Sequence, residues 1–218
     1  MKRCIIFFLK WPAPGEVKTR LAAQAGDEAA VGLARAMAED MLDTFTWVED
    51  TDILICATPK ERLADFKDWL GEDRRYVAQR GPDLGRRMKN AFFTAFHQGY
   101  EQAVLLGSDI PDVHDDDIRQ AFSHLENRQS CVLGPADDGG YWLIGFDAKG
   151  LMAEVFLEMD WGSDQVLKQT VRRLEFDERK VGYVTTRTDV DDLVDLRKVA
   201  RGLKESSRTL KLARSVLD

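Results

Sequence analysis

The chain has 218 residues, with 31 Lys and Arg against 38 Asp and Glu, so its formal net charge is −7. This length suits one large domain, and the acidic balance excludes a nucleic-acid binder that works by broad phosphate neutralisation. A local basic pocket for a small phosphorylated ligand stays compatible with it. Three cysteines without a Cys-x-x-Cys pair, and a first apolar run of only six residues, predict a cytoplasmic protein without disulfides, signal peptide or membrane span.

The chain alternates short apolar runs with amphipathic segments. The apolar runs predict strands at 3–9, 52–57, 75–79, 102–106, 130–134, 140–146 and 180–184. The amphipathic segments predict helices at 27–47, 59–70, 85–98, 115–126, 163–174 and 191–202, with a terminal helix within 201–218. This alternation is typical of an α/β fold, in which helices cover both faces of a mostly parallel sheet. Only a short turn separates the two runs of 130–146, so an antiparallel strand is expected there.

In a parallel sheet, ligands bind beyond the carboxyl ends of the strands, so the segment after each strand matters most. After the first strand, Gly15 lets the backbone approach a ligand, and Lys18 and Arg20 lie where a helix begins. Free N–H groups and cations at a helix start favour a phosphate site, although a solvated Pro/Gly turn is the alternative. The segment is not a P-loop, because Val17 stands where that motif needs Gly.

After the third strand, Gly81 and Gly85 form a turn, and two arginines enter the next helix. Such a pattern occurs in helix caps as well as in binding sites. Gly85 is therefore a candidate contributor to a nucleotide pocket, with a purely structural turn as the equal alternative.

A carboxylate follows the fourth strand. Asp109, in G-S-D-I-P-D, can hold a divalent metal opposite a bound pyrophosphate, whereas an Asx-turn is the alternative. Near the end of the chain, Asp189 or Asp191 of T-D-V-D-D-L could complete that metal site, and Asp192 is expected to begin a helix. The Asp-x-Asp pair comes too late in the chain for a haloacid-dehalogenase phosphatase.

A second pair of carboxylates precedes two glycines in A-D-D-G-G-Y-W. Asp138, favoured over Asp137, is a candidate to contact sugar hydroxyls or to act as a base towards an acceptor, with a turn cap as the alternative. The chain has neither G-x-S-x-G nor G-x-G-x-x-G, which argues against nucleophile-led hydrolysis and NAD chemistry.

Several of these segments together resemble a known family. F-L-K-W-P-A-P-G-E-V-K-T-R-L, G-S-D-I-P, G-P-A-D-D-G-G-Y-W-L-I-G, W-G-S-D-Q-V-L-K-Q-T and D-V-D-D-L occur in this order from about residue 3 to residue 200. In this combination they resemble the glycosyltransferase-A-like family of uncharacterised bacterial proteins, described as nucleotide-diphospho-sugar transferases. The opening motif is also similar to that of the phospholactate guanylyltransferases.

The resemblance implies a nucleotide-diphospho-sugar-transferase fold of the Rossmann-like GT-A type. Residues 1–110 would hold the nucleotide, residues 111–200 the acceptor, and Mg²⁺ or Mn²⁺ would bind Asp109 with Asp189 or Asp191. Asp109 and Asp138 would be catalytic. The nucleotide-binding residues would be Lys10, Pro14, Gly15, Lys18, Arg20 and Gly85, and the acceptor-binding residues Gly139, Gly140 and Trp161.

The chain departs from the family pattern at two places: 107–111 contains no Asp-x-Asp, and Asp192 stands where the family more often has Thr. The donor therefore stays open. The first hypothesis is a metal-dependent transferase with a nucleotide-sugar donor and an unspecified acceptor. The alternatives are a nucleotidyltransferase that releases pyrophosphate, and a nucleotide-binding module without turnover. The base, the acceptor and the oligomeric state are not predicted.

Overall fold

The computed structural model describes residues 1–126 and 130–218 and contains one sheet of seven strands in that part of the chain. Every predicted strand is present, within one or two residues of the expected bounds. Their order across the sheet is β3-β2-β1-β4-β6-β5-β7. The strands are β1 (Arg3–Lys10), β2 (Thr51–Thr58), β3 (Arg75–Ala78), β4 (Gln102–Leu106), β5 (Ser130–Pro135), β6 (Tyr141–Asp147) and β7 (Lys180–Tyr183).

The predicted antiparallel strand is β6, which runs against both of its neighbours, β4 and β5. The other pairs, β1 with β2, β1 with β4, β2 with β3 and β5 with β7, are parallel. Consequently the turn between β5 and β6 lies at the same edge of the sheet as the carboxyl ends of β1, β2 and β4. This edge collects the segments that the sequence singled out.

Eight α-helices connect and cover the strands in the described part of the chain. A short helix, Thr19–Ala25, precedes the predicted long helix. Gly26, with a φ of 89°, separates the two helices. The terminal helix is shorter than 201–218, because it begins only after Ser207, whose hydroxyl accepts the N–H of Leu210. The helices are α1 (Thr19–Ala25), α2 (Asp27–Phe45), α3 (Leu63–Leu70), α4 (Leu84–His97), α5 (Asp115–His124), α6 (Val166–Phe176), α7 (Leu193–Ala200) and α8 (Arg208–Leu217).

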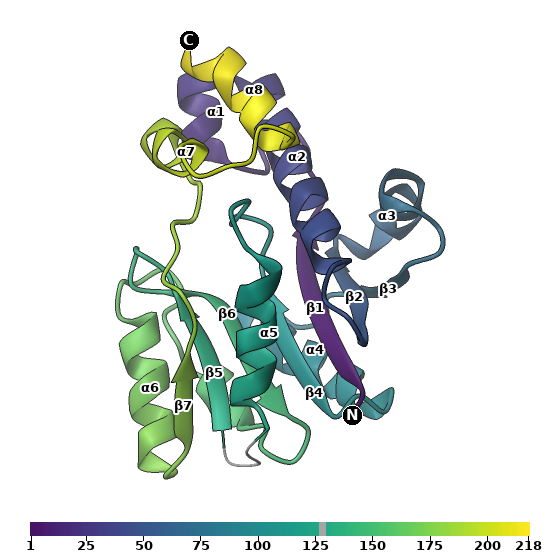
Figure 1. Ribbon diagram of the computed structural model, residues 1–218, viewed down its shortest axis with the longest axis vertical. Helices are drawn as coiled ribbons and strands as arrows, with labels where there is room; N and C mark the ends of the chain where they lie inside the picture. The colour runs from purple at the N-terminus through teal and green to yellow at the C-terminus, as the bar shows by residue number, and fades with distance from the viewer. Residues whose placement is uncertain (127–129) are drawn as a thin grey trace.

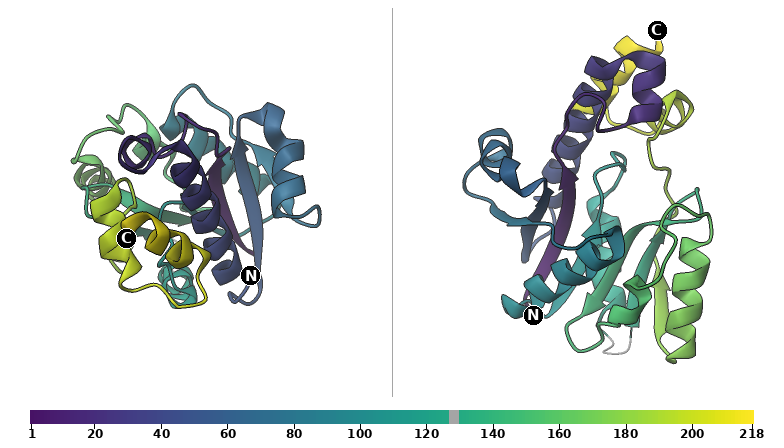
Figure 2. Two further views of the ribbon diagram at one scale, coloured as in Figure 1. Left: turned by 90° about the horizontal axis from the view of Figure 1, so that it is seen from above. Right: turned by 180° about the vertical axis from the view of Figure 1, so that it is seen from behind.

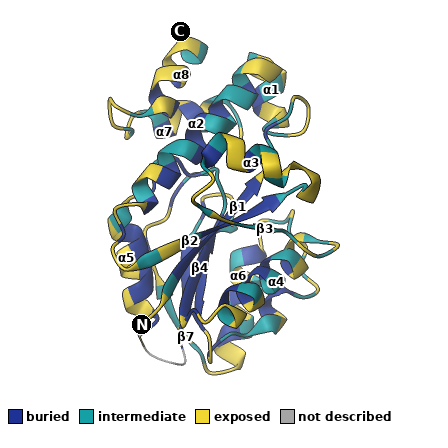
Figure 3. Cartoon of the chain, turned by 90° about the vertical axis from the view of Figure 1, so that its right-hand side faces the viewer, coloured by how far each residue is buried: buried dark blue, intermediate teal, exposed yellow. Residues whose placement is uncertain are grey.

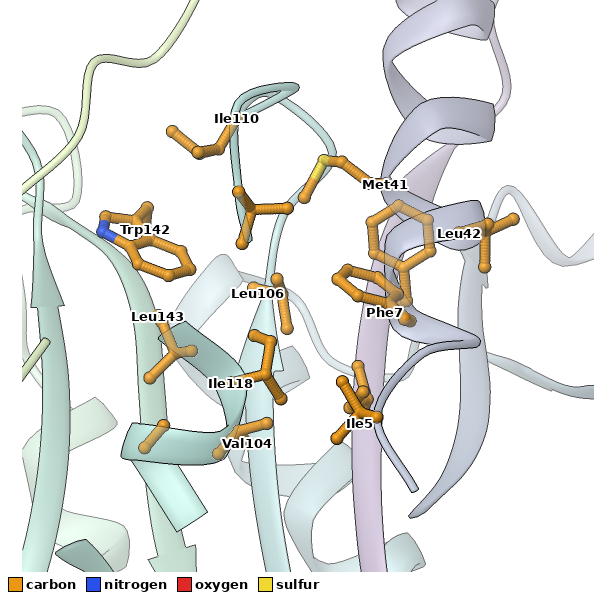
Figure 4. Packing of buried hydrophobic residues seen from close by; sticks show 14 of the residues in the cluster. Ile5, Phe7, Met41, Leu42, Val104, Leu106, Ile110, Ile118, Trp142 and Leu143 are labelled. Carbon is orange, nitrogen blue, oxygen red and sulfur yellow. The ribbon is translucent and has the colours of Figure 1, made fainter. Parts of the chain in front are cut away.

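Alternate residues of β1 point to opposite faces of the sheet. Ile5 and Phe7 pack with α2 and α5 on one face, as Figure 4 shows. Cys4 and Ile6 pack with α4 and α6 on the other face. Both faces are covered, which explains why the strands read as continuous apolar runs and appear buried in Figure 3.

A third apolar cluster holds four helices together beyond the carboxyl edge of the sheet. Leu21 of α1, Leu33 of α2, Leu196 of α7 and Ala213 of α8 are buried in it. In Figures 1 and 2 these helices form a cap above the strands, and an extended segment climbs from β7 to α7 along that side. This segment carries Asp189 and Asp191.

The three cysteines are free thiols buried in β1, β2 and β5. Burial raises the pKa of Cys4 and of Cys56 to about 12, so both thiols stay protonated and unreactive near neutral pH. None of the helices that the structure describes has the length and apolar character needed to span a bilayer.

Candidate functional site

The carboxyl edge of the sheet opens into a cleft of about 440 Å³. Four of the predicted carboxylates line it: Asp109 after β4, Asp138 after β5, and Asp189 and Asp191 after β7. A second cavity of about 370 Å³ adjoins the cleft on the side of α1 and α2, and the two share Lys10 and Asp109 among their walls. Residues from distant parts of the sequence therefore meet in one place.

Backbone hydrogen bonds fix the segment after β7 against the other loops. The N–H of Val190 donates to the carbonyl of Asp109 at 3.0 Å. Arg187 pairs with the segment after β5, since its N–H donates to the Pro135 carbonyl and its carbonyl accepts from Asp137, both at 3.1 Å. The segment thus continues beside the strand ends, which brings its acids towards Asp109.

Lys18 lies inside this group of acids. Its ammonium nitrogen is 2.7 Å from Oδ1 of Asp109 and 3.3 Å from Oδ1 of Asp191. Burial alone would lower the pKa of Lys18, but the adjacent carboxylates of Asp109 and Asp191 outweigh it and raise the pKa above its ordinary value. Arg20, whose side chain is 78% exposed, reaches Oδ2 of Asp191 at 3.7 Å.

Negative charge accumulates around Asp189. Burial, together with the nearby carboxylates of Asp109, Asp138 and Asp191, raises the pKa of Asp189 to about 7, against the lowering effect of Lys18. The cleft therefore holds more negative charge than Lys18 offsets, and such concentrations are typical of functional sites.

This charge predicts a pH-dependent gain in stability for Asp189→Asn in a chelator-containing buffer. In the wild-type protein the pKa of Asp189 is about 7 when folded and about 3.9 when unfolded, so the folded state binds an extra proton between these values. Its contribution to stability therefore falls as the pH rises from about 4 to about 7. At pH 8 we expect the variant to be more stable by on the order of 2–4 kcal/mol in urea unfolding, and the gain to vanish near pH 4.

Asp137→Asn is the matched control. Hydrogen bonds from Lys198 and Thr188, both at 2.6 Å, lower the pKa of Asp137. The ionised Asp137 therefore stabilises the folded state, whereas the ionised Asp189 destabilises it. This variant should be slightly less stable at pH 8, and the difference should shrink as the pH falls. A gain for Asp189→Asn that does not depend on pH would contradict the assigned charge environment.

The loop after β1 places its candidates differently. Lys10 lines both cavities, and its ammonium donates to the carbonyl of Glu16 at 2.6 Å. Pro14 and Gly15 form an exposed turn outside the residues that line either cavity. Gly15 has a φ of 71°, a conformation in which glycine carries no steric cost.

Gly85 and Trp161 contact each other beside the cleft. A Cβ at Gly85 would lie 2.0 Å from the carbonyl oxygen of Phe156 and 2.8 Å from the Trp161 ring. The Trp161 ring packs edge-on against Tyr141, with ring centroids 6.3 Å apart. Neither Gly85 nor Trp161 lines the cleft or the adjoining cavity. Close packing of α4 thus accounts for the glycine.

We therefore expect Gly85→Ala to destabilise the protein by about 1–3 kcal/mol, because the added methyl group forces the backbone at Phe156 to move. Gly32→Ala in α2 is the control: its Cβ would meet only Leu212, at 3.7 Å, and the loss of unfolded-state entropy should stabilise the helix by about 0.5–1 kcal/mol. Chemical denaturation of both variants tests this. If Gly85→Ala were as stable as Gly32→Ala, the backbone at Phe156 would be shown to move without cost.

In the turn after β5, Asp138 forms the turn cap that was one of its two predicted roles, and it also lies in the wall of the cleft. Oδ1 of Asp138 accepts the N–H of Gly140 at 2.8 Å, which is a turn cap, and the same side chain lines the cleft. Gly139 has a φ of 88°, and a Cβ there would lie 2.2 Å from the Asp164 carbonyl oxygen. Asp137 points instead to Lys198 and Thr188.

Comparison with known proteins gives the family. A model of the DUF2064 family, described as uncharacterised proteins conserved in bacteria, matches residues 41–163. The crystal structure of a proposed nucleotide-diphospho-sugar transferase from Desulfovibrio desulfuricans is 38% identical to this chain, with a TM-score of 0.93 over 98% of this chain and 94% of that one. The chain belongs to the DUF2064 family. The resemblance to uncharacterised bacterial proteins of the nucleotide-diphospho-sugar-transferase fold is thereby confirmed.

More distant structures share the fold of this DUF2064 protein. A CMP:2-keto-3-deoxy-manno-octonic acid synthetase complexed with CTP is 10% identical, with a TM-score of 0.61 over 98% of this chain and 100% of that one. A nucleotidyl transferase from Methanothermobacter is 13% identical, with a TM-score of 0.61 over 98% and 99% of the two chains. These similar structures support a transferase, but they do not distinguish a sugar transferase from a nucleotidyltransferase. No curated protein matches the sequence.

The DUF2064 cleft also contains residues that the sequence analysis did not select. Thr58 and Gln79 line it at the ends of β2 and β3. Arg87, one of the two arginines that the sequence placed at the start of the next helix, lines it as well. The amide of Gln79 donates to the carbonyls of Leu9 and Cys56, at 3.3 and 3.0 Å, and so links the carboxyl ends of β1 and β2. The strand predicted at 75–79 included Gln79, whereas β3 ends at Ala78, so the sequence did not mark Gln79 as a residue that follows a strand.

Proposed function

We propose that this DUF2064 protein is a metal-dependent transferase that acts at the phosphates of a nucleotide, with a nucleotide sugar as donor. The observation that carries the proposal is the convergence of four carboxylates in a cleft at the carboxyl edge of the sheet, two of which contact Lys18. The 38% identical protein, which is proposed to be a nucleotide-diphospho-sugar transferase, supports this donor class.

The carboxylates that line the cleft are of the chemical kind that binds Mg²⁺ or Mn²⁺. As the side chains lie, the described residues include no three His, Cys, Asp or Glu groups close enough together to hold a metal ion, and Lys18 contacts two of the carboxylates concerned. Carboxylate oxygens are nevertheless the ligands these ions prefer. Burial, and after it the nearby carboxylates, raise the pKa of Asp189, and a divalent cation would offset the contribution of those carboxylates. Asp109, Asp189 and Asp191 would hold it, and a bound ion would neutralise charge on the leaving phosphate.

The residues of the chain itself would then position the reactants. Lys10 and Arg20 would bind phosphate oxygens, while Thr58 and Gln79 would face the nucleoside. Asp138 would orient the acceptor hydroxyl and take up its proton. Most of the rate enhancement would come from positioning and from electrostatic stabilisation of the leaving group.

Nucleotidyl transfer from a triphosphate is the second candidate. Asp109 has no acidic partner two residues away, unlike the Asp-x-Asp motif of many sugar transferases. Several structures with this fold are nucleotidyltransferases, and one of them was solved with CTP. Sugar transfer leaves a nucleoside diphosphate, whereas nucleotidyl transfer releases pyrophosphate.

The test is a thermal-shift screen of nucleoside mono-, di- and triphosphates and nucleotide sugars, with and without Mn²⁺, followed by product analysis of each ligand that binds. A ligand at a hundred times its Kd stabilises the folded state by about 2.7 kcal/mol, which shifts the melting temperature measurably. Metal-dependent binding with turnover supports a transferase, and the product identifies its class. Binding without turnover favours a binding module, and no binding at all rejects the proposal.

A further inference from the structure

The ammonium group of Lys18 faces the acids rather than the open cleft. The side chain is 6% exposed, whereas its partners Asp109 and Asp191 are 45% and 51% exposed. Its nitrogen lies 2.7 Å from one carboxylate and 3.3 Å from the other. Solvent therefore reaches the two acids more easily than it reaches the lysine between them.

The backbone of Lys18 is strained in a way that supports this placement. Lys18 precedes α1 with φ and ψ both at 47°, the left-handed region that side chains with a Cβ rarely adopt. Such outliers persist where the surrounding structure enforces them, and they cluster at functional sites. In this conformation the side chain of Lys18 contacts Asp109 and Asp191, and its carbonyl accepts the N–H of Ala22.

The neighbouring cations do not share this arrangement. Lys10 donates to a backbone carbonyl, that of Glu16, and Arg20 is largely exposed, with one contact to Asp191 at 3.7 Å. Both are free to turn towards a phosphate without leaving a buried partner. A phosphate would have to compete with two carboxylates for the ammonium of Lys18.

An ammonium and a divalent cation exclude each other at these oxygens. Carboxylate oxygens bind Mg²⁺ at about 2.0–2.1 Å, so an ammonium close to the same oxygens would face a doubly charged ion only a few ångströms away. Resting on the proposed function, we propose that Lys18 is a built-in competitor of the divalent cation for Asp109 and Asp191. Phosphates of the bound nucleotide attract its ammonium and free both carboxylates, so that nucleotide and metal bind cooperatively.

The experiment measures Mn²⁺ binding to the nucleotide-free protein by calorimetry, and nucleoside triphosphate binding in chelator. Lys18→Met should bind Mn²⁺ about tenfold more tightly than the wild type, because the competing charge is gone, and the triphosphate more weakly. Lys18→Arg, which keeps the charge, should bind Mn²⁺ no more tightly than the wild type. Lys10→Met, the matched control, should bind the triphosphate more weakly with unchanged Mn²⁺ affinity.

Circular dichroism confirms that each variant is folded, and Lys18→Gln replaces Lys18→Met if the latter is not. Equal Mn²⁺ affinities of the wild type and the neutral variant, with metal–nucleotide binding intact, would overturn the competition and leave the proposed function standing. If the wild type and all variants bind neither Mn²⁺ nor any nucleotide, the proposed function fails and this inference fails with it.

Discussion

We expect Asp109→Asn to lower kcat/KM for the transfer reaction by about 10²–10³-fold, the range found when one electrostatic contact to a developing charge is removed. Asp109 follows β4 at the centre of the sheet and contacts both the lysine and the segment that carries the other acids. The amide keeps the shape of the carboxylate but loses its charge, so Lys18 loses a partner, as would the divalent cation of the proposed function. Initial rates with the donor identified by the nucleotide screen provide the measurement.

Asp137→Asn is the control for this loss. Asp137 precedes Asp138 in the same turn, but it binds Lys198 and Thr188 and does not line the cleft. Its variant should keep a rate within about twofold of the wild type, as expected for an exposed contact of small energy. An Asp109→Asn enzyme that retains more than about a tenth of the wild-type rate would contradict the electrostatic role given to this carboxylate.

The largest effect on stability is expected for Arg187→Met, which should lower the free energy of unfolding by about 3–5 kcal/mol, the cost of leaving a buried charge without its partner. The guanidinium of Arg187 binds Asp112 at 2.8 Å and Asp117 at 2.5 Å, and it lies over the ring of Trp142. The side chain of Asp117 is only 5% exposed, so water cannot replace the lost contact. Urea unfolding at neutral pH measures the change.

Arg214→Met tests whether burial rather than ion pairing is responsible. Arg214 pairs with Glu205 at 2.5 Å, but both side chains are exposed. Its loss should lower the free energy of unfolding far less than the loss of Arg187, because solvent screens an exposed pair. Similar losses for the two variants would show that the pairs around Arg187 are no stronger than a surface pair.

The strands and the acidic residues of the site were predictable because both follow from local patterns. Apolar runs marked the strands, and the rule that ligands bind at strand ends selected Asp109 after β4. The short turn between two apolar runs indicated the antiparallel β6. Asp189 and Asp191 were selected from their sequence motif, and the parallel pairing of β7 with β5 brings them to the same edge.

The contacts of Lys18 and Gly85 were not predictable in the same way. Lys18 reaches Asp191, 173 residues away, through a left-handed backbone that no local pattern required of a lysine. Gly85 lies against Phe156 and Trp161, which belong to a different helix-and-loop region of the fold. Such details depend on tertiary packing, where sequence spacing carries no information. Gln79 was missed because the predicted strand 75–79 included it, whereas β3 ends one residue earlier, at Ala78.

The segment after β7 also determines when the site is completed during synthesis. Lys18 is synthesised directly after β1, whereas Asp189 and Asp191 follow only after all seven strands of the sheet have been made. Until then Lys18 lacks one of its two carboxylates, and the helices of the cap lack α7 and α8. A partly synthesised chain can therefore form most of its sheet without assembling the carboxylate cluster, which is complete only once the segment after β7 has been made.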